Sequence, residues 1–277
     1  MAKVLTRFAP SPSGYLHLGH AASARHAFRL AEKMGGTCLL RIEDIDTTRC
    51  RPEFETAILE DLHWLGFDWP MPVRRQSDHF SDYQKTLDTL ISRGLVYRCF
   101  KTRKEIMEDI ARAPHYAGEP YKGSKKPLSS GQEAAFLSAN KPYAWRLSLL
   151  ACQEYLGRPY NQLSFTDNGQ ECAAKPERLG DVILARKDVG TSYHLACCHD
   201  DMVQNITHIV RGVDLLESSH IHRLLQEVMN WPTPKYYHHP LLSGKDGKKF
   251  SKRDKSLTIR ELRKGGHTAS DVIKSLP

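Results

Sequence analysis

The stretch that decides the fold lies near the start of the chain and reads VLTRFAPSPSGYLHLGH over residues 4–20. Its first part, Val4 to Phe8, predicts a short buried strand, and the Pro and Gly residues through Gly14 predict a loop. A helix is expected from Leu18 to Met34. Because a helix N-terminus offers unpaired N–H groups and a partial positive charge, this order of elements predicts a phosphate-binding turn.

The same alternation of strands and helices continues along the chain. We expect further strands at 37–42, 181–186 and 207–210, and further helices at 52–65, 78–93 and 218–230. Strands that alternate with helices predict an α/β fold with a parallel sheet, completed by the strands after residue 180. Between residues 97 and 180 Gly and Pro recur and periodicity weakens, which predicts an inserted α+β subdomain. The expected division is therefore 1–96, 97–180 and 181–277.

Composition narrows the class of protein. The 277 residues are 40% hydrophobic and 26% charged, which is ordinary for a globular protein and favours neither a disordered nor a fibrous chain. A net charge of +8 favours a polyanionic partner such as nucleic acid. Seven irregularly spaced cysteines argue against a disulfide framework, and we find neither a signal peptide nor a membrane-spanning apolar run. A cytoplasmic protein with no membrane association is expected.

Two histidines flank the start of the first predicted helix in the pattern His17-Leu18-Gly19-His20. Imidazoles at a helix N-terminus can donate to phosphate oxygens, and Gly19 suits a place where a flat base lies against the backbone. The alternative interpretation is an ordinary helix start with two surface histidines. The motif alone predicts an ATP site made by His17, Gly19 and His20.

A basic segment near the end of the chain reads KFSKR over Lys249 to Arg253 and follows Gly244 and Gly247. Cations on such a loop can stabilise the charge that develops on pyrophosphate when the α-phosphorus of ATP is attacked. Taken alone, a short lysine run is more often a solvated turn. We expect Lys249, Ser251 and Lys252 to act with His17 and His20 in catalysis, and Lys252 to contact ATP.

The two motifs, in this order and at opposite ends of the chain, resemble the signatures of class I aminoacyl-tRNA synthetases. Three further stretches are similar to the glutamyl branch of that family: RFAPSPSG at 7–14, RIEDID at 41–46 and IVRGVDLL at 209–216. The resemblance covers most of the chain and is weakest in the expected insertion. It implies a Rossmann-like catalytic domain that uses ATP, with Mg²⁺ as the counter-ion of ATP, and that has tRNA and L-glutamate as partners.

The resemblance also implies a glutamate pocket. Glutamate presents two carboxylates and one ammonium, so its pocket needs cationic forks and an anion. The residues assigned to it are Arg7, Phe8, Ala9, Pro10, Ser11, Glu43, Tyr193 and Arg211. A different interpretation is that Arg7 and Glu43 pair with each other and that Tyr193 is a core residue. The implied reaction is attack of the substrate α-carboxylate on the α-phosphorus of ATP, which gives an acyl-adenylate and pyrophosphate.

The sequence departs from the glutamyl pattern at a zinc site. Relatives hold zinc with a Cys-x-Cys pair, a tyrosine and a last cysteine. Here Cys99 and Tyr116 match, but Lys101 and Pro120 stand where two cysteines are required. Since a structural zinc site needs four ligands, no structural zinc or other metal site is expected.

A second group of potential ligands is the adjacent pair Cys197-Cys198, with His194, His199 and Asp200-Asp201 nearby. We interpret these cysteines as small buried hydrophobic residues rather than as a metal or thiol site, because free cysteine is commonly buried.

The RNA acceptor is indicated by the short stretch of chain after the second motif. Only 277 − 253 = 24 residues follow Arg253, so no anticodon-binding domain is expected there. That architecture resembles glutamyl-queuosine tRNA(Asp) synthetases, which attach glutamate to the queuosine base, and it implies tRNA(Asp) as the acceptor. A monomer is expected. The alternatives are a short glutamyl-tRNA synthetase that charges the acceptor end, a small-molecule nucleotidyltransferase and a non-catalytic RNA-binding paralogue.

Overall fold

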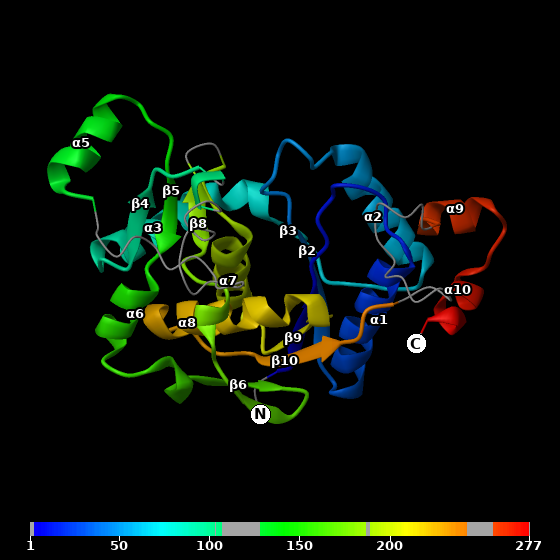
Figure 1. Ribbon diagram of the computed structural model, residues 1–277. Coiled ribbons are helices and arrows are strands. Elements are labelled where there is room, and N and C mark those ends of the chain that lie inside the picture. The colour runs from blue at the N-terminus through cyan, green and yellow to red at the C-terminus, as the bar shows by residue number, and fades with distance from the viewer. Residues whose placement is uncertain (1–2, 103, 107–127, 187–188, 243–256, 277) are drawn as a thin grey trace.

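The structure, a computed structural model, describes residues 3–102, 104–106, 128–186, 189–242 and 257–276. Its first half is the expected alternation of strands and helices (Figure 1). Strand β1 (Leu5–Phe8) pairs in parallel with β2 (Thr37–Ile42), which pairs in parallel with β3 (Arg74–Arg75). Helix α1 (Leu18–Lys33) connects β1 to β2, and α2 (Pro52–Trp64) follows β2.

Helix α1 lies close to the sheet because the side chains on its buried face are small. These buried residues are Ala21, Ala22, Ala24, Ala27 and Ala31. They pack in one apolar cluster with Leu40 and Ile42 of β2 and with Ile58 and Leu62 of α2. The alanine face therefore fixes the position of the helix whose first turn carries His17 and His20.

The second half extends the sheet on the other side of β1. Strands β9 (His208–Gly212) and β10 (Lys235–His239) are parallel and are connected by α8 (Leu216–Met229). The amide of Thr207, just before β9, donates to the carbonyl of Leu5 at 3.0 Å, which places β9 beside β1. The strand order β3-β2-β1-β9-β10 thus reverses between β1 and β9. In such sheets ligands bind in the crevice at the carboxyl ends of the strands where the order reverses.

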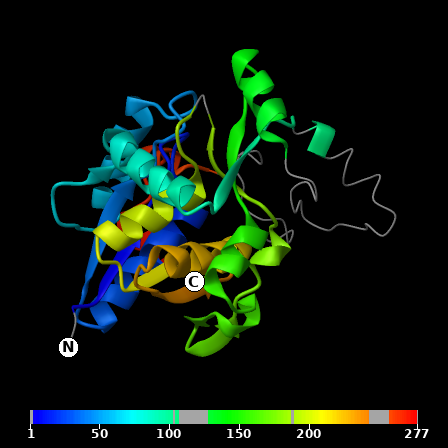
Figure 2. The ribbon, with the colours of Figure 1, turned by 90° about the vertical axis from the view of Figure 1, so that its left-hand side faces the viewer.

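A separate antiparallel sheet of three strands stands to one side of the parallel sheet (Figure 2). It contains β4 (Val96–Cys99), β5 (Ala144–Leu147) and β8 (Ile183–Arg186), and α5 (Ser130–Ser138) and α6 (Leu149–Leu156) belong to the same part of the chain. The expectation that 181–186 completes the parallel sheet is wrong, because β8 pairs antiparallel with β5.

A hairpin inside the expected insertion, in contrast, joins the parallel sheet. Strands β6 (Ser164–Asp167) and β7 (Gln170–Ala173) pair antiparallel, and β6 adds to the edge of β10 in parallel at Asp167 and Tyr236. Strand pairing therefore does not follow the predicted boundaries at 97 and 180. The apolar pattern predicts that a segment is a strand, but the partner of the strand depends on tertiary packing.

The remaining elements complete the layers around the two sheets. The α-helices are α3 (Phe80–Ser92), α7 (Tyr193–Val203), α9 (Ile259–Lys264) and α10 (Ala269–Ser275). Short 3₁₀ turns occur at Gln76–His79, Tyr160–Gln162, Pro176–Arg178 and Val213–Leu215. None of the helices that the structure describes has the length and apolar character needed to span a membrane.

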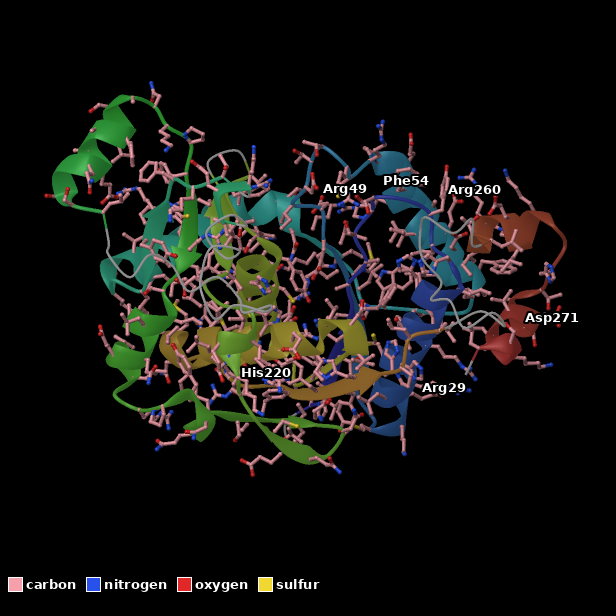
Figure 3. All side chains as sticks on the ribbon, viewed as in Figure 1. Arg29, Arg49, Phe54, His220, Arg260 and Asp271 are labelled. Atoms are coloured by element: carbon pink, nitrogen blue, oxygen red, sulfur yellow. The ribbon has the colours of Figure 1, made fainter. Side chains whose placement is uncertain are left out.

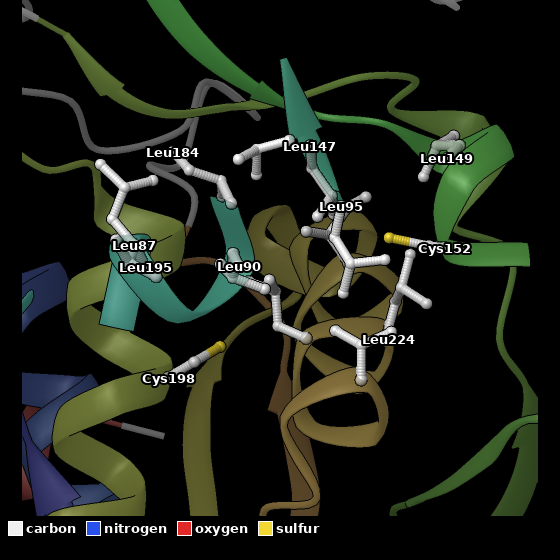
Figure 4. Packing of buried hydrophobic residues seen from close by; sticks show 14 of the residues in the cluster. Leu87, Leu90, Leu95, Leu147, Leu149, Cys152, Leu184, Leu195, Cys198 and Leu224 are labelled. Atoms are coloured by element: carbon white, nitrogen blue, oxygen red, sulfur yellow. The ribbon is translucent and has the colours of Figure 1, made fainter. Parts of the chain in front are cut away.

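One apolar cluster joins the antiparallel sheet to α3, α7 and α8. Figure 4 shows Leu90 and Leu95 packed among Leu147, Leu184 and Leu224. Cys198 of α7 belongs to this cluster and is 2% exposed, so it packs as a small hydrophobic residue. Since α7 shares this core, the position of its first residue, Tyr193, is fixed by the packing of the whole cluster.

Candidate active site

A cavity of about 490 Å³ opens at the carboxyl ends of β1, β9 and β10, where the strand order reverses. Its lining includes every predicted site residue within the described part of the chain, namely Arg7, Phe8, Ala9, Pro10, Ser11, His17, Gly19, His20, Glu43, Tyr193 and Arg211. The other three predicted residues, Lys249, Ser251 and Lys252, lie outside the described residues. The fold thus gathers side chains from distant parts of the sequence around one cavity.

His17 and His20 form the N-terminal cap of α1. The ring nitrogen Nδ1 of His17 accepts from the amide of Gly19 at 3.1 Å, and Nδ1 of His20 accepts from the amide of His17 at 3.2 Å. Because Nδ1 is an acceptor in both, each neutral ring carries its proton on Nε2. The first turn of α1 contains no acidic residue. This end of the helix therefore carries two imidazole Nε2–H groups at the positive end of the helix dipole, a setting that suits an anion.

Gly19 is required by the way His17 folds back over the helix. A Cβ built at Gly19 would lie 2.9 Å from Cε1 and 3.0 Å from Nδ1 of the His17 ring. A side chain at this position would push that imidazole out of its capping position. The immediate neighbour of Gly19 is thus the His17 ring.

The basic KFSKR segment lies outside the described residues, and Leu242 and Leu257 are the described residues on either side of it. Leu242, the last described residue before it, lines the cavity. After it, Thr258 forms a β-bridge with His17, and the amide of Ile259 donates to the carbonyl of Leu16 at 2.8 Å. The guanidinium of Arg260 lies over the Tyr15 ring at 5.2 Å, and that ring also contacts the ring of Phe54 of α2; Figure 3 labels Arg260 and Phe54. The described residues that flank the segment therefore lie at the cavity, through Leu242, and beside the start of α1, through Thr258 and Ile259.

A network of buried ion pairs includes two residues of the cavity lining, Arg7 and Glu43. The Nε of Arg7 lies 3.0 Å from Oδ1 of Asp201, and Nη1 of Arg41 lies 2.8 Å from the same oxygen. Arg41 also reaches Oε1 of Glu43 at 3.0 Å. The interpretation in which Arg7 pairs with Glu43 is therefore wrong, because Asp201 and Arg41 occupy those places.

The neighbouring carboxylate, Asp200, ties α7 to β3, to the 3₁₀ turn after it and to α3. Its oxygens accept from Nε of Arg74 at 2.9 Å, from Nε2 of Gln76 at 3.0 Å and from the hydroxyl of Tyr83 at 2.9 Å. Sequence reasoning treated Asp200 and Asp201 only as possible metal ligands. Within the described residues, no group of three His, Cys, Asp or Glu side chains is arranged to hold a metal ion.

The two acids on the cavity side of this network differ in pKa. Burial alone would raise the pKa of Asp201, but the guanidinium groups of Arg7 and Arg41 bring it below the ordinary value. For Glu43 burial dominates, and its pKa is raised despite the attraction of Arg41. The ionised Asp201 therefore stabilises the folded protein, whereas the ionised form of Glu43 is disfavoured by burial and lowers the stability of the fold.

Arg211 has neutral partners only. At the end of β9 it is 5% exposed. Its Nη1 donates to the Tyr193 hydroxyl at 3.0 Å, and its Nε donates to Nε2 of His238 at 3.3 Å. Its other contacts are Ser219 and His222. Among the described residues no carboxylate forms an ion pair with Arg211, so its charge remains available to a bound anion.

Cys197 contacts the buried ion pairs, with Sγ 3.6 Å from Nη2 of Arg41 and 3.8 Å from Nη2 of Arg7. Burial and the neighbouring carboxylates raise its pKa to about 12, which keeps the thiol protonated. The interpretation of Cys197 as an unreactive buried residue agrees with this setting, although its contacts are polar.

Sequence analysis missed several residues of the cavity lining, including Ser23, Asp214, His239 and Leu241. His239 ends β10, a strand that was not predicted because its sequence, KYYHH, has no apolar alternation. Of the four positions discussed for zinc, Cys99 is buried in β4 and Lys101 is exposed, whereas Tyr116 and Pro120 lie outside the described residues.

Residues 3–276 match the family model described as tRNA synthetases class I (E and Q), catalytic domain. The chain belongs to this family. Its members are ligases of the aminoacyl-tRNA synthetase type, so this is the enzyme class of the chain. The parallel sheet with its helices is the class I catalytic fold.

Individual relatives carry two different names. A Glutamyl-Q tRNA(Asp) synthetase from Rhodobacter capsulatus is 40% identical, and the match covers 97% of this chain and 98% of that protein. A Glutamate–tRNA ligase from Aquifex aeolicus is 35% identical, over 100% of this chain and 57% of that protein. The chain thus spans little more than half of the second relative.

Solved structures lead to the same family. A glutamate tRNA ligase from Elizabethkingia meningosepticum, described as a complex with its amino acid, is 29% identical with a TM-score of 0.73. A glutamate–tRNA synthetase from Elizabethkingia anophelis, also 29% identical, has a TM-score of 0.75. Each match covers 96% of this chain and 54% of the solved chain.

Proposed function

We propose that the protein activates L-glutamate with ATP to give glutamyl-adenylate and transfers the glutamyl group to the queuosine base of tRNA(Asp). The observation that carries the amino-acid part is the setting of Arg211 at the cavity. The buried guanidinium groups of Arg7, Arg41 and Arg74 are paired with the carboxylates of Glu43, Asp200 and Asp201. Arg211 lines the same cavity and has only neutral hydrogen-bond partners among the described residues, so a carboxylate of the substrate can pair with it. Glutamate offers such a carboxylate on its side chain.

We assign the side-chain carboxylate of glutamate to Arg211 and the Tyr193 hydroxyl. Arg211 is buried, and a planar guanidinium suits bidentate binding of a carboxylate. The reacting α-carboxylate must instead meet ATP near α1. Discrimination against glutamine follows, because its neutral amide would leave the buried charge of Arg211 without a counter-ion.

The α-ammonium of glutamate is assigned to Glu43. One carboxylate oxygen of Glu43 accepts from Arg41, and the other has no hydrogen-bond partner among the described residues. Burial raises the pKa of Glu43, and a bound ammonium would offset that burial. Ser11, which also lines the cavity, would supply a hydroxyl to the substrate.

ATP is assigned to the N-terminus of α1, where the Nε2–H groups of His17 and His20 would donate to phosphate oxygens. Mg²⁺, when bound to ATP, would neutralise phosphate charge. An oxygen of the α-carboxylate attacks the α-phosphorus, the bond to the bridging oxygen breaks and pyrophosphate leaves. We assign Lys249, Ser251 and Lys252 to stabilising the leaving group, supported by the described residues on either side of them: Leu242 lines the cavity, and Thr258 forms a β-bridge with His17.

The second step transfers the glutamyl group to RNA. A hydroxyl oxygen of the acceptor attacks the acyl carbon, loses its proton and displaces AMP. Queuosine as the acceptor is supported by the Rhodobacter capsulatus relative, whose match runs through 98% of that protein. The net charge of +8 supports binding of tRNA. We also propose that the protein acts as a monomer in the cytoplasm, as expected from its sequence.

A second candidate function, charging of the tRNA acceptor end, is supported by the similarity to glutamate–tRNA ligases. Two assays test the proposal. Glutamate-dependent exchange of pyrophosphate into ATP tests activation, and exchange driven by another acid, or by none, would overturn it. Labelled glutamate is then offered with tRNA(Asp) prepared with and without queuosine. We expect transfer to the first only, and transfer that persists without queuosine would favour the second candidate.

A further inference from the structure

We propose that His238 and Asp167 are positioning residues that hold the Arg211 guanidinium in the orientation that binds the side-chain carboxylate of the substrate. This inference rests on the proposed function. His238 lies in β10, and Asp167 ends β6, inside the segment that the sequence indicates is an insertion. The β6–β7 hairpin would thereby fix the orientation of a side chain in the amino-acid pocket.

The hydrogen-bond roles in this chain are fixed by chemistry. A guanidinium can only donate, so Nε of Arg211, 3.3 Å from Nε2 of His238, makes that nitrogen an acceptor. The neutral ring therefore carries its proton on Nδ1, which lies 2.9 Å from Oδ1 of Asp167. The Ser219 hydroxyl, 2.9 Å from Nε2, approaches the same acceptor. Asp167 thus selects the tautomer of His238 that can accept from Arg211.

The β6–β7 hairpin holds His238 through its backbone as well. Oδ1 of Asp167 accepts from the amide of His238 at 3.1 Å, and Nδ2 of Asn168 donates to the carbonyl of His238 at 3.2 Å. Asn168 and Gly169 have φ values of 49° and 81°, which form a tight turn. Because the turn is tight, Asp167 and Asn168 reach both sides of one residue of β10.

The ring of Tyr236 limits rotation of the same groups. It stacks on His238 with an interplanar angle of 3°, and the Arg211 guanidinium carbon lies 5.2 Å from its centroid. The Tyr236 hydroxyl accepts from Nε2 of Gln226 at 3.0 Å, which fixes the ring in turn. Tyr236 therefore limits tilting of the Arg211 guanidinium plane, while His238 fixes the direction of its Nε–H group.

Neutral partners matter because of what Arg211 must do. A carboxylate in direct contact would hold the guanidinium equally well but would cancel the charge that the substrate requires, as Asp201 does for Arg7. With the His238 imidazole between them, Asp167 can fix the orientation of Arg211 without forming an ion pair with it. Burial and Arg211 lower the pKa of His238 despite Asp167, and the pKa of His222 is lowered well below 6.5, so both rings remain neutral.

The test uses the full chain and glutamate-dependent pyrophosphate exchange. His238→Leu removes the acceptor, and we expect the KM for glutamate to rise about tenfold or more, the effect of losing a hydrogen bond to a charged group. The KM for ATP should stay within about twofold. His238→Gln supplies an amide oxygen as acceptor and should restore most of the loss. Asp167→Ala should raise the KM for glutamate, whereas Asp167→Asn, which keeps an acceptor oxygen, should do so less.

His208→Leu is the matched control, because His208 is a buried histidine of the neighbouring strand β9 that contacts Thr207 and Tyr237. It should leave the KM for glutamate unchanged even if it lowers thermal stability. If the wild type is active and His238→Leu has the same KM for glutamate, the inference is overturned. If His238→Leu does not fold, an unchanged KM in Asp167→Ala overturns it instead. Equal rises in the KM values for glutamate and ATP would also overturn it. Absence of glutamate-dependent exchange in the wild type would instead overturn the proposed function.

Discussion

Replacing Asp201 with asparagine removes the anion that two buried guanidinium groups share. Asp201 is 3% exposed and lies within 3.0 Å of both Arg7 and Arg41. Removing one partner of a buried ion pair costs about 3–5 kcal/mol because the remaining charge is left uncompensated. We therefore expect the free energy of unfolding to fall by about 3–5 kcal/mol. This is a large part of the about 5–15 kcal/mol typical of a domain.

The pH range of this measurement follows from the pKa of Asp201. Folding lowers that pKa below the ordinary value of 3.8, so the stabilisation is fully present above 3.8 and is lost as the pH falls through the folded value. Urea unfolding at several pH values between about 6 and 8 should therefore give one constant difference between variant and wild type.

Glu43→Gln is the matched comparison. Burial raises the pKa of Glu43, so its charge destabilises the folded state at neutral pH, and a neutral isostere should cost little or nothing in stability. The same variant should raise the KM for glutamate, because the proposed partner of the substrate ammonium is lost. The assignment of Asp201 as the structural anion is refuted if Asp201→Asn unfolds within about 1 kcal/mol of the wild type, or if Glu43→Gln costs as much as Asp201→Asn.

Three further predictions concern the ATP side of the site and the support of α9. Lys252→Ala should lower the rate of adenylate formation about 100-fold or more with little change in glutamate binding, measured by single-turnover kinetics and equilibrium dialysis; equal losses in both would contradict the role given to Lys252. Gly19→Ala should displace the His17 ring, whose Cε1 lies 2.9 Å from the added Cβ, and raise the KM for ATP about tenfold in the exchange assay, while an unchanged KM would argue against the capping role. Asp61 of α2 is buried, and desolvation raises the pKa of its carboxyl to about 6, with Arg263 and Arg260 offsetting this only in part. Because the folded pKa is raised, the free energy that Asp61 adds to folding is largest at low pH and declines as the pH rises from 3.8 to about 6. Asp61→Asn should therefore stabilise the protein by about 1–3 kcal/mol at pH 7.5 and flatten this decline in urea unfolding, and a less stable variant would show that the carboxylate has a stabilising partner.

Local sequence signals were sufficient for β1, α1 and β2, three of the elements that carry the site. The strand before the loop at residue 9 was predicted one residue longer at its start than β1, and the strand at 37–42 has the predicted bounds. The predicted first helix ends one residue beyond α1. These segments have strong hydrophobic patterns and clear Pro and Gly boundaries, so local propensity and tertiary packing agree.

Long-range pairing could not be predicted from the sequence. The segment 181–186 forms a strand, but it pairs with β5 rather than with the parallel sheet, because hydrophobicity does not specify a partner. The partner of Arg7 is 194 residues away at Asp201, beyond the reach of any spacing rule. The hydrogen bonds from Asp167 through His238 to Arg211 depend on a parallel pairing of β6 with β10 at a single register position. Such contacts are determined only when the whole chain has folded.

The most direct test of the proposed function is to locate the glutamate that the enzyme attaches. After reaction with ATP, labelled glutamate and tRNA(Asp) that contains queuosine, the RNA is digested to nucleosides and analysed by mass spectrometry. We expect the label on the queuosine nucleoside, with the terminal adenosine unmodified. Label on the terminal adenosine, with queuosine unmodified, would contradict the proposed acceptor.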